Sequence, residues 1–294
     1  MSTSSRLTEV FNSAPEITFD DESKFIFFSD CHRGDNSWAD DFAPNQTLMF
    51  YALDYYLKAG FTYVEVGDGE ELWETVHFED IQRAHSHIYW KISQFHQDGR
   101  FYKIFGNHDI VWKDPQKVQR EFWPYYNEIT RAEEPFFTSL EIHEGLVFKH
   151  QETGQRIFVV HGHQGDLLSD TLWWVGRLLI RVLWKPLQLL GIRDPTSPAK
   201  NFEKRKSVEL EISRWVMENN QPLICGHTHR PVFPDAGEPP YFNDGSCVHP
   251  RCITGMEIEN GEISLIKWWI TPNDAGQLCV TRTLLEGPRK IAEV

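Results

Sequence analysis

Short, mainly apolar runs recur along the chain, and each run ends in a polar cluster that contains glycine or histidine. Apolar runs of this length, stopped by polar and turn-forming residues, are typical of buried β-strands that lead into loops. The sequence predicts such strands at residues 24–29, 61–66, 101–105, 157–160 and 222–225.

Helical periodicity separates the first three runs. One periodic stretch has apolar positions from Leu48 to Leu57, begins after Pro44 and stops before Gly60, and a second extends over residues 79–95. The alternation of strands and helices predicts an α/β protein built on a sheet.

Hairpin signals appear in the second half of the chain. One hairpin is predicted over residues 142–160 with its turn near Gly154, and another over residues 253–268. The second has its turn at Asn260 and Gly261, an Asn-Gly pair that favours a two-residue β-turn. Antiparallel hairpins combined with an α/β pattern predict mixed sheets.

Residues 167–205 interrupt this pattern. The segment is dense in Trp and Leu, contains Pro186 and Pro195, and separates two strands that carry polar clusters. We interpret it as a helical insertion, the cap, within a single domain that spans residues 1–294.

Composition and charge exclude some classes of protein. The chain has 294 residues, of which 40% are hydrophobic, and this share is too high for a disordered chain. Its net charge is -14, with 29 Lys and Arg against 43 Asp and Glu. Because a protein that grips a nucleic-acid backbone needs many cations, no nucleic-acid partner is expected.

Cysteine usage and the absence of long apolar stretches indicate the compartment. The five cysteines are odd in number and form no C-x-x-C pair, which fits neither a disulfide framework nor a zinc ribbon. The amino-terminal residues lack a secretory apolar core, and no run of about 18 apolar residues is present. We expect a cytoplasmic protein, with peripheral contact to the inner face of the membrane left open.

The polar clusters after the strands are rich in Asp, Asn and His, where open α/β sheets place their chemistry. Residues i and i+2 of an extended segment project to the same side, so Asp30 can converge with His32, and His227 with His229. One such pair is weak evidence, but all five strand ends carry metal-ligand residue types, which predicts a metal site. The clusters are residues 30–32, 67–68, 106–109, 161–163 and 226–229.

The motif order D-x-H, G-D-x-x-E, G-N-H-D, H and G-H-x-H resembles that of the calcineurin-like metallophosphoesterases, from about Phe25 to Trp268. The resemblance implies an α/β fold of four layers, an α-β-β-α sandwich of two mixed sheets, with two divalent metal ions at the strand ends. It also implies that Asp68 bridges the ions. The other implied ligands are Asp30, His32 and His229 for the first ion and Asn107, His161 and His227 for the second.

One ligand assignment stays open in the cluster at residues 161–163. His161 directly follows its strand, as the family ligand does. His163 is a candidate substrate contact, a neighbour of the ligands or a surface loop histidine.

Carboxylate, amide and imidazole ligands without thiolate suit Mn²⁺, the expected ion, or alternatively Fe or Zn²⁺. Two ions about 3.5 to 4 Å apart lower the pKa of a water held between them and clamp the phosphate oxygens. A metal-bound hydroxide is then the expected nucleophile, and Cys31 and Cys225 are expected only to pack between ligands.

His108 and Asp109 are the expected catalytic residues. An imidazole oriented by a carboxylate can protonate the leaving oxygen or stabilise transition-state charge, the role that the family gives to the histidine. The alternative for Asp109 is a turn or capping residue.

The cap carries a basic stripe in an otherwise acidic protein. Arg177, Arg181 and Lys185 are spaced four residues apart among Trp and Leu, which places them on one side of a helix. Such a segment suits an anionic membrane surface, or an apolar groove with Arg177 and Arg181 as phosphate contacts. The alternative is a buried helix whose cations reach solvent.

The closest resemblance is to the UDP-2,3-diacylglucosamine pyrophosphatase-like branch, which has a helical cap in the same place. Residues 67–73 read G-D-G-E-E-L-W and residues 226–231 read G-H-T-H-R-P, as in that branch. Arg230 is expected to contact a substrate phosphate or to form a structural salt bridge. Two departures separate the chain from the branch: His108 stands where Arg is usual, and Arg33 replaces an apolar residue.

The expected function is therefore dinuclear, metal-dependent hydrolysis of a phosphodiester or pyrophosphate bond. The expected partner is a phosphate-ester small molecule or a lipid-linked or UDP-sugar-type substrate. One alternative is a phosphomonoesterase acting on a protein or nucleotide, and another is a scaffold of the same fold without activity. The sequence does not predict the oligomeric state.

Overall fold

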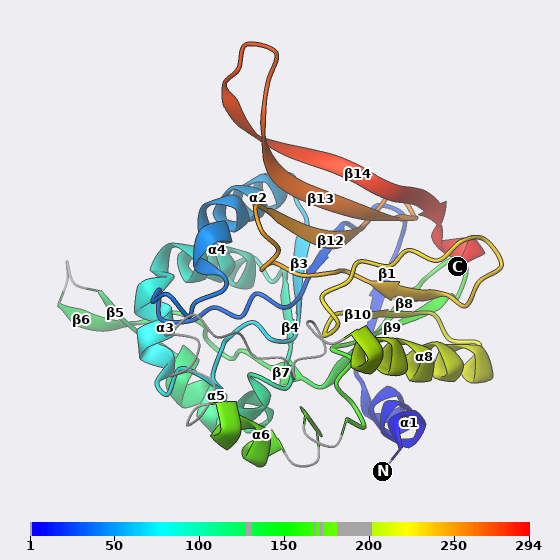
Figure 1. Ribbon diagram of the computed structural model, residues 1–294, viewed down its shortest axis with the longest axis horizontal. Coiled ribbons are helices and arrows are strands. Elements are labelled where there is room, and N and C mark those ends of the chain that lie inside the picture. The colour runs from blue at the N-terminus through cyan, green and yellow to red at the C-terminus, as the bar shows by residue number, and fades with distance from the viewer. Residues whose placement is uncertain (1, 128–130, 167–168, 171–172, 181–201) are drawn as a thin grey trace.

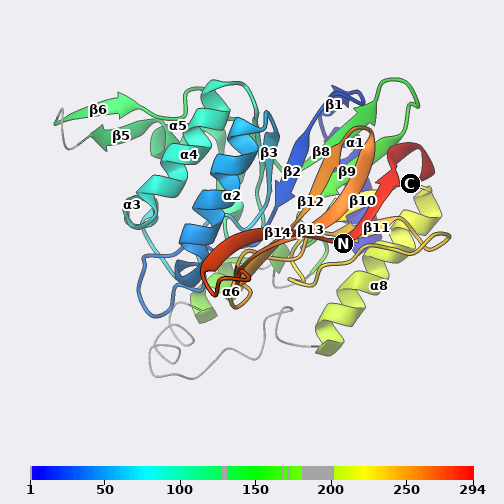
Figure 2. The same cartoon turned by 90° about the horizontal axis from the view of Figure 1, so that it is seen from above.

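The computed structural model of the protein describes residues 2–127, 131–166, 169–170, 173–180 and 202–294 (Figure 1). Two mixed β-sheets lie side by side, and helices cover both outer faces (Figure 2). The four layers are helices, a seven-stranded sheet, a five-stranded sheet and helices. The predicted four-layer α/β architecture with two mixed sheets is confirmed.

The larger sheet has the strand order β14-β13-β12-β2-β3-β4-β7. Strands β2, β3, β4 and β7 are parallel, and β12, β13 and β14 continue the sheet as antiparallel neighbours. Because parallel strands end at the same edge, the loops after β2, β3 and β4 open side by side. The bounds are β2 Phe25–Phe28, β3 Thr62–Val66, β4 Phe101–Ile104, β7 Ile142–His143, β12 Cys252–Glu259, β13 Glu262–Pro272 and β14 Leu278–Lys290.

The smaller sheet has the strand order β1-β8-β9-β10-β11, in which only β8 and β9 are antiparallel. A separate two-stranded ribbon is formed by β5 and β6. The bounds are β1 Glu16–Phe19, β5 Pro124–Asn127, β6 Ala132–Pro135, β8 Gly145–His150, β9 Arg156–Val160, β10 Leu223–Cys225 and β11 Tyr241–Asn243.

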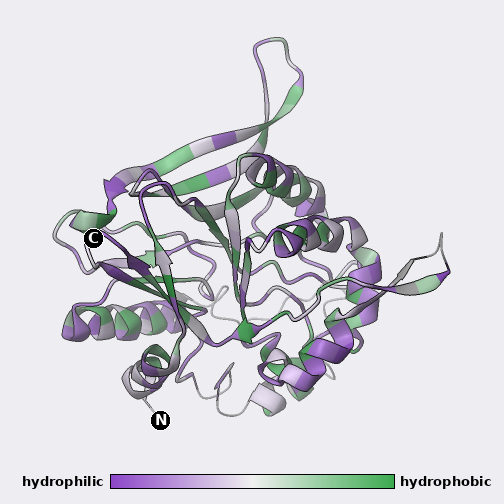
Figure 3. Ribbon diagram, turned by 180° about the vertical axis from the view of Figure 1, so that it is seen from behind, coloured by the Kyte–Doolittle hydropathy of each residue, from purple (hydrophilic) through white to green (hydrophobic). Residues whose placement is uncertain are grey.

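Helices α2 and α4 lie on the seven-stranded sheet, whereas α1 and α8 lie on the five-stranded sheet (Figure 2). Hydrophobic and hydrophilic residues alternate around these helices, as Figure 3 shows, so each can bury one side. The bounds are α1 Thr3–Ser13, α2 Gln46–Lys58, α3 Phe78–Ala84, α4 Ser86–Gln97, α5 Pro115–Phe122, α6 Trp173–Leu179 and α8 Phe202–Asn219, with a short 3₁₀ helix at Ile110–Lys113.

Strand β2 shows how alternation builds the layers. Ile26 and Phe28 pack into the cluster beneath α2 and α4, while Phe25 and Phe27 pack between the sheets. Phe148 of β8 meets both Phe25 and Phe27, with ring centroids 5.0 and 5.4 Å apart. Since all four β2 side chains are buried, the strand appears in the sequence as an uninterrupted apolar run.

All five strands predicted from apolar runs are present, as β2, β3, β4, β9 and β10. The Asn260-Gly261 hairpin is also confirmed, because β12 and β13 pair antiparallel up to Glu259 and Glu262 and both turn residues have positive φ, at 55° and 68°. The periodic stretch over residues 79–95 forms two helices that break at His85, where a buried side chain contacts Asp40 at 2.8 Å. Residues 142–143, predicted as part of a hairpin, pair instead with β4 in the other sheet.

Much of the expected cap lies outside the described residues, including Arg181 and Lys185. The described part comprises residues 169–170 and 173–180, with α6, and residues 202–205, which belong to the first turns of α8. Among the described helices, none combines the length and apolar character needed to cross a membrane.

Candidate metal centre

The loops that follow β2 and β3 continue the pairing of these strands. The amide of Asp30 donates to the Gly67 carbonyl at 3.1 Å, and the amide of His32 donates to the Asp68 carbonyl at 2.8 Å. These bonds fix Asp30, His32 and Asp68 relative to one another before any side-chain contact is considered.

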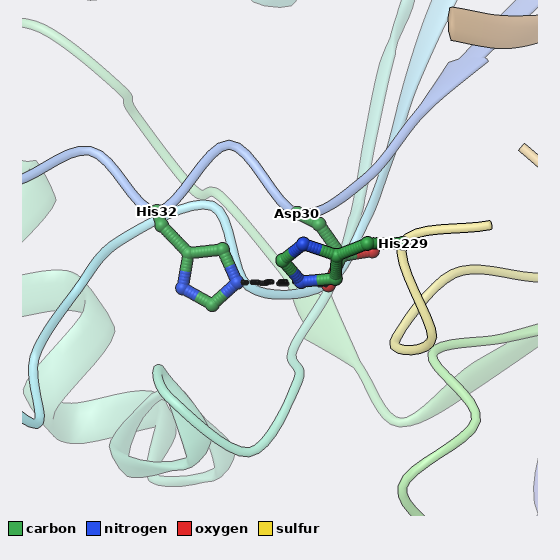
Figure 4. A group of neighbouring side chains, drawn as sticks. All are labelled: Asp30, His32 and His229. Atoms are coloured by element: carbon green, nitrogen blue, oxygen red, sulfur yellow. Dashed lines mark hydrogen bonds and ion pairs between the residues drawn. The ribbon is translucent and has the colours of Figure 1, made fainter. Parts of the chain in front are cut away.

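Asp30, His32 and His229 form a first group of potential ligands (Figure 4). His229 Nε2 lies 3.0 Å from Asp30 Oδ1 and 3.2 Å from His32 Nε2. His32 Nε2 lies 3.6 Å from Asp30 Oδ1. Atoms this close can share one cation, so the structure brings these three predicted residues together.

Asp68, His161 and His227 form a second group, in which all three side chains are buried. Asp68 Oδ2 lies 3.1 Å from His161 Nε2 and 3.6 Å from His32 Nε2. The Asp68 carboxylate therefore stands between the two groups, where a bridging ligand would be required.

Unsatisfied donor and acceptor atoms mark the same place. Asn107 Oδ1 and His227 Nε2 are buried and form no hydrogen bond with the described residues. Asp30 Oδ1 and His161 Nε2 are also buried without a well-formed hydrogen bond, and their near neighbours are other candidate ligands, among them His229 and Asp68. A buried polar atom left unpaired costs about 1–3 kcal/mol, so a concentration of such atoms calls for another partner. Oxygen and imidazole nitrogen atoms are suitable donors for Mn²⁺, Fe or Zn²⁺, and the residues present therefore fit two divalent cations.

The backbone at the ligand positions is unusual. Several candidate ligands adopt left-handed conformations, which are uncommon for residues other than glycine but more accessible to Asn, Asp and His. Such conformations cluster at functional sites, where the surrounding structure enforces them. The residues and their φ angles are Asp30 (49°), His32 (47°), Asp68 (50°), His227 (66°) and His229 (55°).

Glycine residues allow the ligands to approach the neighbouring loops. A Cβ at Gly67 would lie 2.5 Å from His161 Nδ1, and a Cβ at Gly226 would lie 2.4 Å from Asp30 Oδ2. Both positions require the absence of a side chain. The glycines of the sequence motifs thus provide space for the ligands rather than ligands themselves.

The charges of the second group depend on one another. Burial disfavours the Asp68 carboxylate, but His161 and His108 overcome this effect and hold the pKa of Asp68 well below its usual range. Burial also opposes the imidazolium of His161, yet Asp68 raises the pKa of His161 to about 9. Because a metal ligand must be neutral imidazole, cation binding at His161 would release a proton.

Glu71 is a functional candidate that the sequence analysis did not assign. Its Oε2 lies 2.7 Å from His32 Nδ1, and its Oε1 lies 2.8 Å from His108 Nδ1. One carboxylate therefore orients a candidate ligand and the expected catalytic histidine at once. The signal in the sequence is the Glu of the G-D-x-x-E motif.

Trp73 completes the surroundings of His108. Its ring stacks on the His108 ring, and its Nε1 donates a hydrogen bond to the Asn107 carbonyl at 2.6 Å. The backbone amide of His108 donates to Asp68 Oδ1 at 2.8 Å. The His108 ring is thus fixed by a stacking contact, a carboxylate and its own backbone.

Asp109 does not contact His108 in the way expected from its position in the chain. Its carboxylate accepts hydrogen bonds from the backbone amides of Gly69 and Gly106, at 3.0 and 2.6 Å. Burial raises the pKa of Asp109 to about 7. Asp109 therefore joins the loops after β3 and β4, and the carboxylate beside His108 is that of Glu71.

A fully buried ionic network lies beneath these loops. Arg33 binds Glu65 at 2.7 and 2.8 Å and Glu70 at 2.7 Å. Lys103 contacts Glu65 and lies 3.0 Å from Glu70 Oε2. Glu70 precedes Glu71, so the network fixes the backbone that carries the shared carboxylate. The ion pairs of Arg33 with Glu65 and Glu70 explain why Arg33 occupies a position at which an apolar residue was expected.

Ser29 forms a hydrogen bond with the Asp30 carboxylate and also contacts Asp244. Ser29 Oγ bonds to Asp30 Oδ2 and lies 2.6 Å from Asp244 Oδ1. Because one hydroxyl has one proton, only one of these carboxylates can accept from it. Burial raises the pKa of Asp244 well above its ordinary value, and the charge of Asp30 acts in the same direction.

The proposed substrate contacts are dispersed. Arg230 pairs with Glu209 of α8 at 3.1 Å, which is the structural salt bridge left open by the sequence. Arg177 of α6 borders a small cavity of about 120 Å³ together with Lys117, Leu72 and Trp112. Arg181 lies outside the described residues.

His163 is buried rather than on the surface, with 1% of its area exposed. Its ring centroid lies 5.5 Å from that of His161, but the structure places His161 in the group around Asp68 and His163 in another group, with Glu144 and Asp170. Burial and then the charge of His161 lower the pKa of His163 to about 3.

Comparisons with known proteins address the same residues. The sequence profile described as Metallophos, calcineurin-like phosphoesterase, matches residues 23–231. No match was found among curated proteins. Among solved structures, Vps29 from Chaetomium thermophilum is similar, with 12% sequence identity over 90% of this chain and 96% of that chain and a TM-score of 0.34.

Proposed function

Because the chain belongs to the calcineurin-like phosphoesterase family, we propose that it hydrolyses a phosphodiester or pyrophosphate bond at the centre between Asp68 and its neighbouring groups. The proposal includes two divalent cations, with Mn²⁺ as the physiological ion. The substrate carries an apolar portion, as a lipid-linked or UDP-sugar-type ester would.

The observation that carries the proposal is the set of buried, unsatisfied ligand atoms. The first cation would be held by Asp30, His32 and His229, and the second by Asn107, His161 and His227. Asp68 stands between the groups and can bind both cations. When bound, such a pair supplies Lewis-acid stabilisation of phosphoryl charge and lowers the pKa of a coordinated water.

The protein side chains would orient the reaction and supply a proton. His108 stands beside the first group, with its ring centroid 4.6 Å from that of His32. Burial opposes protonation of His108, but Glu71 and Asp68 overcome this effect and raise its pKa. The His108 ring would therefore donate a proton to the leaving oxygen, with Glu71 holding its Nδ1 side.

Helix α6 supports an amphipathic substrate. It exposes Trp174 and Leu178, at 58% and 56%, on the same short helix as Arg177. Arg177 would bind an anionic group of the substrate, and the exposed apolar side chains would contact its apolar portion. His163 and Arg230 are less suitable as contacts, because His163 is buried and Arg230 pairs with Glu209.

The same features support peripheral contact with an anionic membrane, through which a lipid-linked substrate would be reached. Neutralising Arg177, Arg181 and Lys185 together should then reduce co-sedimentation with vesicles that contain anionic lipid. Binding that is unchanged in this variant would remove the membrane contact from the proposal without affecting hydrolysis.

The decisive experiment measures hydrolysis of bis(p-nitrophenyl) phosphate with and without Mn²⁺. Asp68→Ala and His229→Ala should each abolish Mn²⁺-dependent turnover while circular dichroism and the unfolding midpoint show a folded protein. Asp98→Ala, at a half-exposed carboxylate in a turn, is the matched control and should retain activity. Full activity in either ligand variant would refute the site.

A phosphomonoesterase is the second candidate function, and the histidine at position 108 favours it because the pyrophosphatase-like branch usually has Arg there. Turnover of p-nitrophenyl phosphate and of bis(p-nitrophenyl) phosphate should be compared at equal Mn²⁺ concentration. A higher kcat/KM for the monoester would assign the chain to this second class. A panel that adds UDP-sugar lipids and cyclic nucleotides then identifies the substrate.

A further inference from the structure

A second polar cluster adjoins the dinuclear centre without sharing its residues, where the cap joins the sheets. It consists of Glu144, between β7 and β8, His163, just beyond β9, and Asp170, in the segment that leads to α6. One potential ligand atom from each residue lies within 4.8 Å of the others. None of these atoms belongs to the two groups around Asp68.

His163 points to a missing partner in this cluster. The side chain is 1% exposed, and neither Nδ1 nor Nε2 forms a hydrogen bond with any described residue. A buried imidazole normally donates from one nitrogen and accepts at the other, so two unpaired nitrogens are costly. A cation bound to one nitrogen would satisfy that atom directly.

The two carboxylates are each bonded through one oxygen among the described residues. Arg6 of α1 contacts Glu144 Oε1 at 2.6 Å and Asp170 Oδ2 at 3.0 Å. The Gly165 amide also donates to Asp170 Oδ2, at 2.9 Å. The described contacts therefore use Glu144 Oε1 and Asp170 Oδ2, and they leave Glu144 Oε2 and Asp170 Oδ1 for another ligand.

The charge balance also favours a cation. Arg6 is the guanidinium shared by Glu144, Asp170 and Glu9, which lies 2.7 Å from its Nη1. Glu144 and Asp170 are the two carboxylates of the cluster itself, and one guanidinium that also pairs with the more exposed Glu9 leaves them with an excess of negative charge. A divalent cation would balance this excess, and Arg6 would remain on the outer oxygens of its ligands.

We propose that Glu144, His163 and Asp170 bind a third divalent cation, distinct from the two of the dinuclear centre. Two carboxylates and one imidazole, without thiolate, are the donor set of a Zn²⁺ or Mn²⁺ site that water completes. The bound ion would connect the beginning of the cap to the ends of both sheets. The inference does not depend on hydrolytic activity, because the cluster shares no residue with the reacting site.

The experiment compares metal content between the wild-type protein and the double variant Glu144→Gln/Asp170→Asn. Both are equilibrated with Zn²⁺ or Mn²⁺, passed through a desalting column and measured by inductively coupled plasma mass spectrometry. The variant should contain one ion fewer per chain than the wild type, and Glu141→Gln/Asp98→Asn, at more exposed carboxylates, should contain the wild-type number. Equal metal content in the double variant and the wild type would overturn the proposal.

The conservative substitutions retain hydrogen-bond acceptors for Arg6, which protects the fold. If the double variant does not fold, Asp170→Asn alone is measured in the same way, because Asp170 lies beyond the sheets in the segment that leads to the cap. A loss of one ion supports the third site, and no loss overturns it. Hydrolysis of bis(p-nitrophenyl) phosphate is measured in parallel, so failure of the dinuclear site and failure of the third site are recognised separately.

Discussion

The Trp73 ring lies nearly parallel to the His108 ring, with ring centroids 4.4 Å apart and an interplanar angle of 19°. The same tryptophan donates to the carbonyl of Asn107, the residue before His108. A single side chain therefore fixes both the backbone that presents a candidate ligand and the ring expected to donate a proton. This relationship explains the tryptophan that follows the G-D-x-x-E motif.

Trp73→Leu should lower kcat about 100-fold with little change in KM, because a displacement of about 1 Å at a reacting group can cost that much. Trp73→Phe keeps the stacking surface and loses the hydrogen bond, so its kcat should lie between those of the wild type and Trp73→Leu. Steady-state kinetics on an aryl phosphodiester measure these effects. Trp90→Leu, at an exposed tryptophan of α4, is the control. Equal kcat in Trp73→Leu and the control would contradict the role given to the ring.

Glu71→Gln should change the pH dependence of turnover. Glu71 raises the pKa of His108 against the effect of burial, so the imidazolium persists to higher pH in the wild type. Loss of that negative charge lowers the pKa of His108, and the alkaline limb of the kcat profile should move to lower pH. The effect should be largest for phenyl esters, whose leaving group needs a proton more than p-nitrophenol does. An alkaline limb at the same pH for Glu71→Gln would argue against His108 as the donor, and Glu79→Gln is the exposed control.

Gly67→Ala should destroy the second ligand group, whereas Gly60→Ala should not. The two glycines have the same φ of 82°, so the strain of a left-handed alanine is matched between the variants. They differ in surroundings, because a Cβ at Gly67 meets the His161 ring and a Cβ at Gly60 meets nothing within 4 Å. Titration with Mn²⁺ should show loss of one or both cations only in Gly67→Ala. Normal metal binding in that variant would show that the loop can move away from His161.

Lys103→Met should destabilise the fold strongly. Its ammonium is buried among Glu65, Glu70 and Asp109, and removing one partner of a buried ionic group typically costs about 3–5 kcal/mol. Lys58→Met, at a largely exposed lysine that pairs with Asp54, should cost less than about 1 kcal/mol. Urea denaturation measures both free energies of unfolding. An equal loss of unfolding free energy in Lys103→Met and Lys58→Met would mean that water reaches the buried ionic network.

The strands and most of the candidate ligands could be predicted from the sequence because burial on both faces gives β2 and β9 continuous apolar character. The polar residue that follows each such strand must then lie at the sheet edge, and Asp30 and His161 were found in this way. The hairpin at Asn260 could be predicted from the sequence equally well, because its turn depends on local backbone conformation alone.

Other features depend on contacts between distant segments, which a single sequence does not show. Nothing local reveals that Glu71 reaches both His32 and His108, or that the charged side chain of Lys103 lies inside the protein. Helix α8 was not predicted because few of its side chains are buried, among them Ile212 and Trp215, so its apolar period is weak.

The left-handed backbone at the ligand positions limits how this centre can be redesigned. Asp30, His32, Asp68, His227 and His229 belong to the residue types that tolerate positive φ best, so ligand chemistry and backbone geometry select the same amino acids. Exchanges among Asp, Asn and His should preserve the loops, whereas a β-branched residue would add backbone strain to the lost ligand. A library that aims to change the preferred metal should therefore sample Asp, Asn, His and Gly at these positions, and seek additional donors at positions whose backbone is extended.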